Sequence, residues 1–194
     1  MKRKWRIRSN VGQHACTRRR LRALAVDRRG ATIIEFAIVA APFIALLLAI
    51  VQTSLVFFTQ QTLETAAEHA GRKLMTGAAQ NGGMTEASFK ATACNSLPSF
   101  MDCGKLMIDV ENADSFENID TSMPTLTYDS DGNISNSWKF EPGGVGQIVV
   151  MRTMYQMPVV SGPLGFDLSD MGRGRRLLIA TSVFKTEPYA GTGT

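Results

Sequence analysis

Hydrophobic residues are concentrated in one uninterrupted stretch in the N-terminal third of the chain. From Phe36 to Val51 every residue is Phe, Ala, Ile, Val, Pro or Leu. Extended to Ala31 and Phe58, the stretch contains 28 residues, which would measure about 42 Å as an α-helix and exceed the roughly 30 Å of a hydrocarbon layer. The pattern therefore predicts one transmembrane helix over residues 31–58.

A cleaved secretory signal is the competing interpretation of this stretch. Such a signal usually has an apolar run of about 7–15 residues that ends at a small-residue cleavage site. Here the run is longer, no such site is obvious at its distal end, and it continues into a helical pattern. We therefore favour a retained anchor, with a bend at Pro42 because proline removes a backbone donor.

The helical periodicity extends beyond the apolar stretch. Apolar residues recur at helical spacing from Leu63 to Leu74, and no Gly or Pro interrupts residues 52–70. Gly77 and the Asn81-Gly82-Gly83 turn are expected to end this helix. The sequence thus predicts one helix from Ala31 to Thr76, with its second half packed on a folded domain.

The remaining pattern predicts a short helix and then strands. Thr85 is a candidate N-cap for a second helix that Pro98 would terminate. Alternating or wholly apolar runs predict strands over residues 106–110, 138–140, 148–155 and 177–184. We expect an α+β fold in which the long N-terminal transmembrane helix packs on a small antiparallel sheet of three or four strands.

Charge separates the chain into two parts of opposite sign. Residues 1–29 contain 11 basic residues and one acidic residue, a net charge of +10, and the remaining residues carry −6. The overall +4 is therefore due to the leader, and the rest of the chain is acidic. A basic arm can bind nucleic acid. A basic segment directly before an apolar span is instead typical of an end that stays in the cytoplasm. We favour this topogenic role and expect no nucleic-acid partner.

Glu35 is the one charged residue of the predicted span and stands five residues after Gly30. A carboxylate at this depth is costly and needs a partner. If the chain were cut after Gly30, Ala31 would carry a new amine, and Glu35 of one subunit could pair with that amine on a neighbour. A carboxylate that merely lies among lipid headgroups is the simpler alternative.

The residues around Glu35 carry a family resemblance. The string Arg28-Arg29-Gly30-Ala31-Thr32-Ile33-Ile34-Glu35-Phe36 resembles a type IV prepilin cleavage motif. With the run from Ala37 to Phe43 and from Val56 to Ala66, it resembles the TadE-like family of pseudopilins from the tight-adherence (Tad, or Flp) pilus system. Looser matches follow at Cys94 and Cys103, Phe140–Gly143, Val149–Tyr155 and Phe184–Tyr189.

This resemblance implies a pilin-like fold and a role in assembling a fibre for adhesion or biofilm formation. A prepilin peptidase would cut between Gly30 and Ala31, and an assembly machine driven by a cytoplasmic ATPase would insert the product. Glu35, Phe36 and Pro42 would act in assembly with other pilin-like subunits. The implied organisation is a cytoplasmic leader (1–30), an inner-membrane helix (31–58) and a periplasmic or fibre-exposed α+β domain (59–194). Translation could also start inside the leader, at Val11 or Leu21, without changing the processed product.

Three cysteines are present, of which Cys16 lies in the leader. Cys94 and Cys103 lie in the exported part with eight residues between them, and an oxidising periplasm would favour a structural disulfide between them. Metal binding would require further ligands, and a redox pair would favour C-x-x-C spacing. We predict the disulfide.

No set of residues indicates catalysis, a cofactor or a metal site. His69, the one exported histidine, lacks an evident nucleophile or orienting partner. Asp129–Asn133 begins like a calcium loop, but Ile134 and Phe140 stand where that loop needs Gly and Glu, so we predict a polar turn. We expect Arg173, Arg175 and Arg176 to form a solvated loop before a strand, with a charge contact between subunits as the alternative. The alternative function is a membrane-anchored periplasmic enzyme or binding protein that never enters a fibre.

Overall fold

A computed structural model describes residues 30–119 and 122–188 of the chain. The basic leader, including Cys16, therefore lies outside the described residues except for Gly30. The chain divides into two compact units between Leu47 and Leu48, inside one long helix. The second unit contains the sheet and the helix segment that packs on it.

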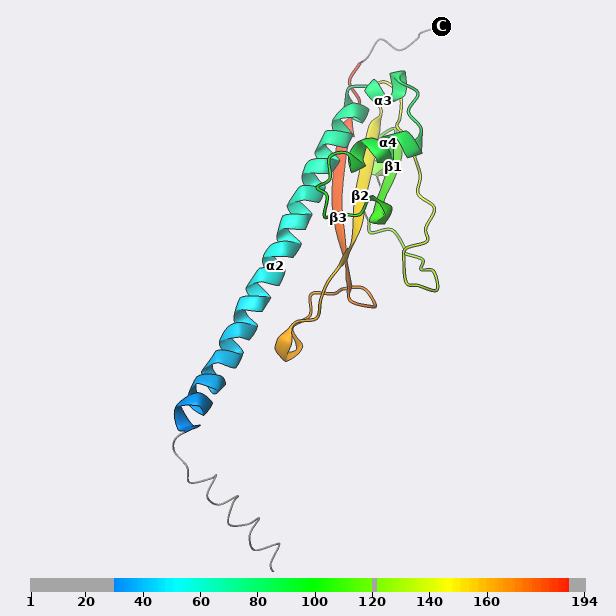
Figure 1. The fold of residues 1–194 in the computed structure, drawn as a ribbon. Coiled ribbons are helices and arrows are strands. Elements are labelled where there is room, and N and C mark those ends of the chain that lie inside the picture. Colours follow the sequence, from blue (N-terminus) through cyan, green and yellow to red (C-terminus); the bar gives the residue numbers. More distant parts are fainter. Residues whose placement is uncertain (1–29, 120–121, 189–194) are drawn as a thin grey trace, which may run out of the picture. The chain divides into compact units, whose positions relative to one another are not determined.

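Helix α2 runs from Ala31 to Met75, which confirms the predicted long helix with an error of one residue at its end (Figure 1). Gly77 adopts a left-handed conformation, with φ of 72°, directly after the last turn, where glycine is the least strained residue. Arg72 and Lys73 lie in that turn, where positive charge interacts favourably with the helix dipole. Pro42 lies inside α2, and the helix continues through it.

Three antiparallel strands form the sheet in the order β1-β2-β3, as predicted (Figure 1). Their bounds are Leu106–Ala113 for β1, Ile148–Pro158 for β2 and Arg175–Lys185 for β3. The fourth predicted strand, at residues 138–140, is wrong. Phe140 makes only an isolated parallel bridge to Val110, and Pro142 follows closely and has no backbone donor with which to extend a ladder.

The core lies between α2 and one face of this sheet. Leu63, Ala67, Ala70 and Leu74 of α2 are at most 1% exposed and belong to one cluster with β1 and β2. Gly71 explains the close approach of the helix, because a Cβ built there would lie 3.2 Å from Met151 Cε. The same glycine that lowers helix propensity thus permits the packing.

Short helices connect these elements. Helix α3 spans Ala78–Asn81, and α4 spans Glu86–Cys94, with Thr85 as its N-cap accepting a hydrogen bond from Ser88 N–H at 3.3 Å. This cap confirms the predicted start of the second helix. Phe89 of α4 is fully buried, and its ring centroid lies 5.3 Å from that of Phe140. The 3₁₀ turns η2, η3 and η4 cover Cys103–Lys105, Phe116–Asn118 and Pro163–Gly165.

Candidate functional site at the start of the long helix

The predicted processing and assembly residues lie at the beginning of α2. Gly30 directly precedes Ala31, the first residue of the helix, and a Cβ built on Gly30 would meet no atom within 4 Å. The first turn of α2 contains no acidic residue, so Glu35 is the first carboxylate along the helix. Among the residues that the structure describes, no hydrogen bond or ion pair involves the Glu35 side chain.

The helix surface that follows Glu35 is apolar on all sides. Phe36 is 74% exposed, and most large apolar residues from Ile33 to Phe58 are more than half exposed in the single chain. Only Ala45 and Val56 are buried among the apolar residues of this part of the helix. A helix that is apolar all round requires a nonpolar environment. Within the described part of the chain, α2 is the helix whose length and composition suit a membrane span, and its position fits membrane anchoring.

The hydroxyl groups near the end of this apolar part donate hydrogen bonds to backbone carbonyls of the preceding helical turn. Thr53 donates to Ala49 O, Ser54 to Ile50 O and Thr59 to Leu55 O, each at 2.8 Å. Such bonds back to the preceding turn lower the cost of placing a hydroxyl in lipid. The polar residues at this end of the predicted span are therefore compatible with a nonpolar environment.

The predicted disulfide between Cys94 and Cys103 is present. It joins the end of α4 to the turn η2 that leads into β1. The enclosed loop is also held by Tyr155, whose hydroxyl accepts a hydrogen bond from Asp102 N–H at 3.0 Å. Burial raises the pKa of the Tyr155 hydroxyl above its usual value, although the bond from Asp102 N–H opposes this shift. The disulfide thus has a structural place beside the core.

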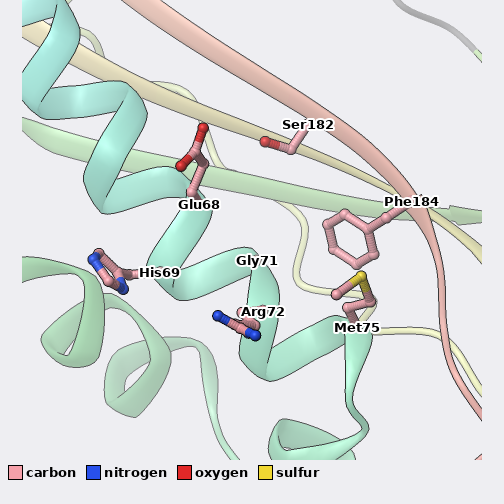
Figure 2. Close-up of a pocket in the computed structure, with 7 residues that line it drawn as sticks. All are labelled: Glu68, His69, Gly71, Arg72, Met75, Ser182 and Phe184. Atoms are coloured by element: carbon pink, nitrogen blue, oxygen red, sulfur yellow. The ribbon is translucent and has the colours of Figure 1, made fainter.

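A shallow hollow of about 300 Å³ lies between α2 and β3 (Figure 2). Its lining combines Phe184, Met75 and Gly71 with the polar residues Glu68, His69, Arg72 and Ser182. The side chains of Glu68 and His69 point in different directions (Figure 2). Among the described residues around this hollow, no hydrogen bond joins His69 to Glu68 or Ser182.

The Asp129–Asn133 segment forms the predicted polar turn. Asp129 Oδ1 accepts hydrogen bonds from the backbone N–H of Asp131 at 2.9 Å and of Asn133 at 2.7 Å. Hydrogen bonds from the Asn133 side chain and backbone hold the pKa of Asp129 below its usual range. Within the described ranges, no group of three or more His, Cys, Asp and Glu side chains is placed to hold a metal ion.

The arginine cluster differs from the predicted solvated loop. Arg175 begins β3 and donates to the backbone oxygens of Gly132 and Asp131 at 2.6 and 2.7 Å. Arg173 donates to Ser130 O at 2.9 Å. Both guanidinium groups therefore fix the polar turn to the β2–β3 hairpin, a contact between segments more than 40 residues apart that local sequence cannot indicate.

Sequence reasoning also missed a buried ion pair on the sheet. Asp109 of β1 lies opposite Arg152 of β2, and Arg152 Nη1 lies 2.7 Å from Asp109 Oδ2. The sequence signal was a charge inside each apolar strand, because a charge in such a place needs a partner. The pair joins β1 to β2, and Glu111 Oε2 lies 3.5 Å from the same Arg152 Nη1.

Comparison with known proteins identifies the N-terminal segment. No curated protein and no solved structure matches this chain. The model of one family, described as TadE-like protein, matches residues 30–72, from the glycine before α2 almost to the end of that helix. Over this segment the chain is similar to TadE-like proteins, which confirms the resemblance drawn from its sequence.

Proposed function

We propose that this protein is a minor pseudopilin that takes part in assembling the Tad pilus and supports adhesion and biofilm formation. The observation that carries the proposal is the TadE-like match, which begins at Gly30 and covers the Gly30-x4-Glu35 spacing. Its partners would be other pilin-like subunits, the pilus assembly machinery and a prepilin peptidase. The leader would remain in the cytoplasm, and the domain from residue 59 would lie in the periplasm or in the fibre.

Processing would occur between Gly30 and Ala31. A Cβ built on Gly30 would meet no described atom within 4 Å, and the helix that begins at Ala31 would remain intact after the cut. Removal of residues 1–30 would also remove the +10 charge that precedes the span. Such a charge holds its end of the chain on the cytoplasmic side. Processing would therefore release the helix for movement out of the membrane.

Glu35 would then align the processed subunit with its neighbours. Its carboxylate lacks a partner among the described residues, and an unpaired charge within an apolar segment is costly. The amine that processing creates on Ala31 of an adjacent subunit is a cation of the required kind. Pairing between these groups would set the axial position of one helix against the next, while Phe36 and Pro42 would shape the apolar surface that packs there.

The experiment that tests processing is intact mass measurement of the membrane-associated protein, with and without the cognate peptidase. We expect a chain that starts at Ala31 when the peptidase is present, and the full leader when it is absent. A Gly30→Leu variant should keep its leader, whereas Gly172→Leu provides a control, because Gly172 is a distant, exposed glycine with open space around it. A soluble product with a terminus inside residues 48–60 would refute the proposal, because it would indicate a cleaved signal.

The role of Glu35 is tested separately from processing. We expect Glu35→Gln to be processed normally but to lose co-purification with pilus subunits, since glutamine keeps the shape of the side chain and removes its charge. Glu86→Gln is the matched control, because Glu86 is an exposed carboxylate in the first turn of α4. Unchanged assembly of the Glu35→Gln variant would exclude the pairing.

A further inference from the structure

The β2–β3 hairpin ends in an uncharged, exposed apolar tip, defined here as residues 159–166. No charged residue lies between Gln156 and Asp167. Leu164 is 86% exposed and Val160 is 76% exposed, more than any other large apolar side chain of the described domain. Isolated exposed apolar residues are ordinary, but two within five positions on an uncharged loop form a patch that needs an explanation.

The backbone of the tip holds Leu164 outward. Its φ of 60° lies in the left-handed region, which leucine rarely adopts. Pro163 and Gly165 flank it in the short 3₁₀ turn η4, and Gly165 also has a positive φ of 80°. A strained residue persists only where its surroundings determine its conformation. Here that conformation places a large apolar side chain in the open and not in the core.

The tip is attached to the part of α2 that lies inside the predicted span. Gln52 Nε2 donates a hydrogen bond to Val160 O at 3.1 Å. Gly162 makes this approach possible, because a Cβ at that position would lie 3.0 Å from Gln52 Oε1. Phe166 lines an apolar hollow together with Ile50 and Phe57 of the same helix. Figure 1 shows this end of the hairpin beyond the β2 and β3 arrows, coloured orange.

The contact with Gln52 sets the depth of the tip relative to a bilayer. A hydrocarbon layer of about 30 Å corresponds to about 20 helical residues. Counted from Phe36, the first residue after Glu35, this layer ends near Leu55. Gln52 lies three residues before that boundary, or about 4.5 Å inside it along the helix axis. With the layer placed in this way, the tip would lie at its edge.

A second loop contacts α2 near the end of the predicted span. Phe100, in the loop closed by the Cys94–Cys103 disulfide, is 56% exposed, and its ring centroid lies 5.8 Å from that of Phe58. Phe58 lies six residues beyond Gln52, about 9 Å further along α2. With a hydrocarbon layer that ends near Leu55, Phe100 would lie at headgroup level, where aromatic side chains are favoured. Both loops thus continue the apolar surface of the helix around the end of its span.

We propose that the tip, residues 159–166, inserts into the lipid leaflet on the side of the folded domain and forms a second membrane contact beside α2. This inference rests on membrane anchoring by α2. We infer lipid as the partner of this apolar patch because the patch continues the apolar surface of α2 through Phe166, Ile50 and Phe57, and that surface requires a nonpolar environment. Val160 and Leu164 would reach the acyl chains, and the charges that begin at Asp167 would remain among the headgroups.

Fluorescence quenching by brominated lipid tests this contact in the full chain. The parent carries Trp5→Phe and Trp138→Phe, and the protein is reconstituted at low density in vesicles of phosphatidylcholine and phosphatidylglycerol with brominated acyl chains. Leu164→Trp reports on the tip. Phe116→Trp is the matched control, because Phe116 is 66% exposed and follows the end of β1 that pairs with Ile148, at the opposite end of β2 from the tip. Leu46→Trp reports on the span.

We expect Trp at position 164 to lose most of its emission in brominated vesicles, and Trp at position 116 to lose little. Equal quenching at positions 164 and 116, with strong quenching at 46, would overturn the proposal while leaving the anchor intact. Weak quenching at all three positions would refute the anchor itself. Protection at position 164 that appears only in concentrated protein would identify a second copy as the occupant and also overturn the proposal. If Leu164→Trp fails to fold, Val160→Trp serves the same purpose.

Discussion

The buried ion pair between Asp109 and Arg152 gives the sharpest test of how this domain is stabilised. The two residues are 4% and 5% exposed, and their charged atoms lie 2.7 Å apart. The second oxygen of Asp109 accepts a hydrogen bond from Lys139 N–H at 3.0 Å, which fastens the segment beside β1. Arg152→Met removes the cation and leaves the Asp109 carboxylate buried with that one donor.

The expected loss of unfolding free energy follows from the Asp109 carboxylate, which stays buried after Arg152 is replaced. Loss of one member of a buried pair costs about 3–5 kcal/mol, because the other charge stays desolvated. The double variant Asp109→Leu/Arg152→Met removes both charges and leaves mainly the N–H of Lys139 without its acceptor, at a cost of about 1–3 kcal/mol. The double variant should therefore be more stable than Arg152→Met alone. With a denaturant dependence of about 4 kcal/mol per M in guanidinium, the single substitution lowers the midpoint by about 1 M.

The measurement is guanidinium unfolding of the full chain in detergent, followed by the fluorescence of Trp138 in a Trp5→Phe parent. Trp138 is half-buried and adjoins Lys139, so it reports on this region. Lys185→Met is the control, since it removes an exposed cation from the neighbouring strand. If the double variant loses as much stability as Asp109→Leu and Arg152→Met together, an uncompensated charge is not the cause of the loss.

Three further predictions concern stability. Cys94→Ser should lower the free energy of unfolding by about 3 kcal/mol, the loop-entropy value for a short loop, and reduction of the wild-type protein should lower it equally in the same denaturation assay. Gly71→Leu should cost about 1–3 kcal/mol by displacing Met151, whereas the exposed Gly172→Leu should cost much less, as thermal unfolding would reveal. Because burial raises the pKa of Tyr155, its contribution to stability is fully present below pH 10 and is lost as pH rises through the folded-state pKa. Wild type should therefore lose more stability than Tyr155→Phe between about pH 9 and 11; parallel losses would exclude this effect.

Local patterns predicted the elements of this fold. The apolar run and the helical spacing of Leu63 to Leu74 predicted α2, and Thr85 predicted the start of α4, because caps and periodicity depend on neighbours in sequence. Residues 138–140 resembled a strand, but the proline and glycines that follow limit them to one bridge. Whether such a run becomes a strand or makes a single bridge depends on the backbone donors of the residues that follow it. The hydrophobic pattern does not describe these donors.

Contacts between distant segments could not be predicted in the same way. Asp109 and Arg152 meet because the register of β1 and β2 places them opposite each other, and no feature within either strand specifies that register. The candidate site at Gly30 and Glu35 is different, since all of its residues lie within one stretch of the chain. The spacing of these residues could be recognised from the sequence alone. The structure adds that the helix begins at Ala31 and that the Glu35 side chain has no partner among the described residues.

Two glutamine side chains fix the folded domain along α2. Gln52 donates to Val160 O at the hairpin tip, and Gln60 donates to Ile179 O of β3 at 3.0 Å. The two glutamines lie eight residues apart, about 12 Å along the helix, and each bonds a backbone carbonyl, so their spacing opposes sliding of the sheet along α2. An amide that loses such a partner in a nonpolar environment loses more than it would in water. If the tip enters a bilayer as proposed, its depth follows from the position of Gln52 within the apolar stretch, and a shift of the helix along the membrane normal would carry the tip with it.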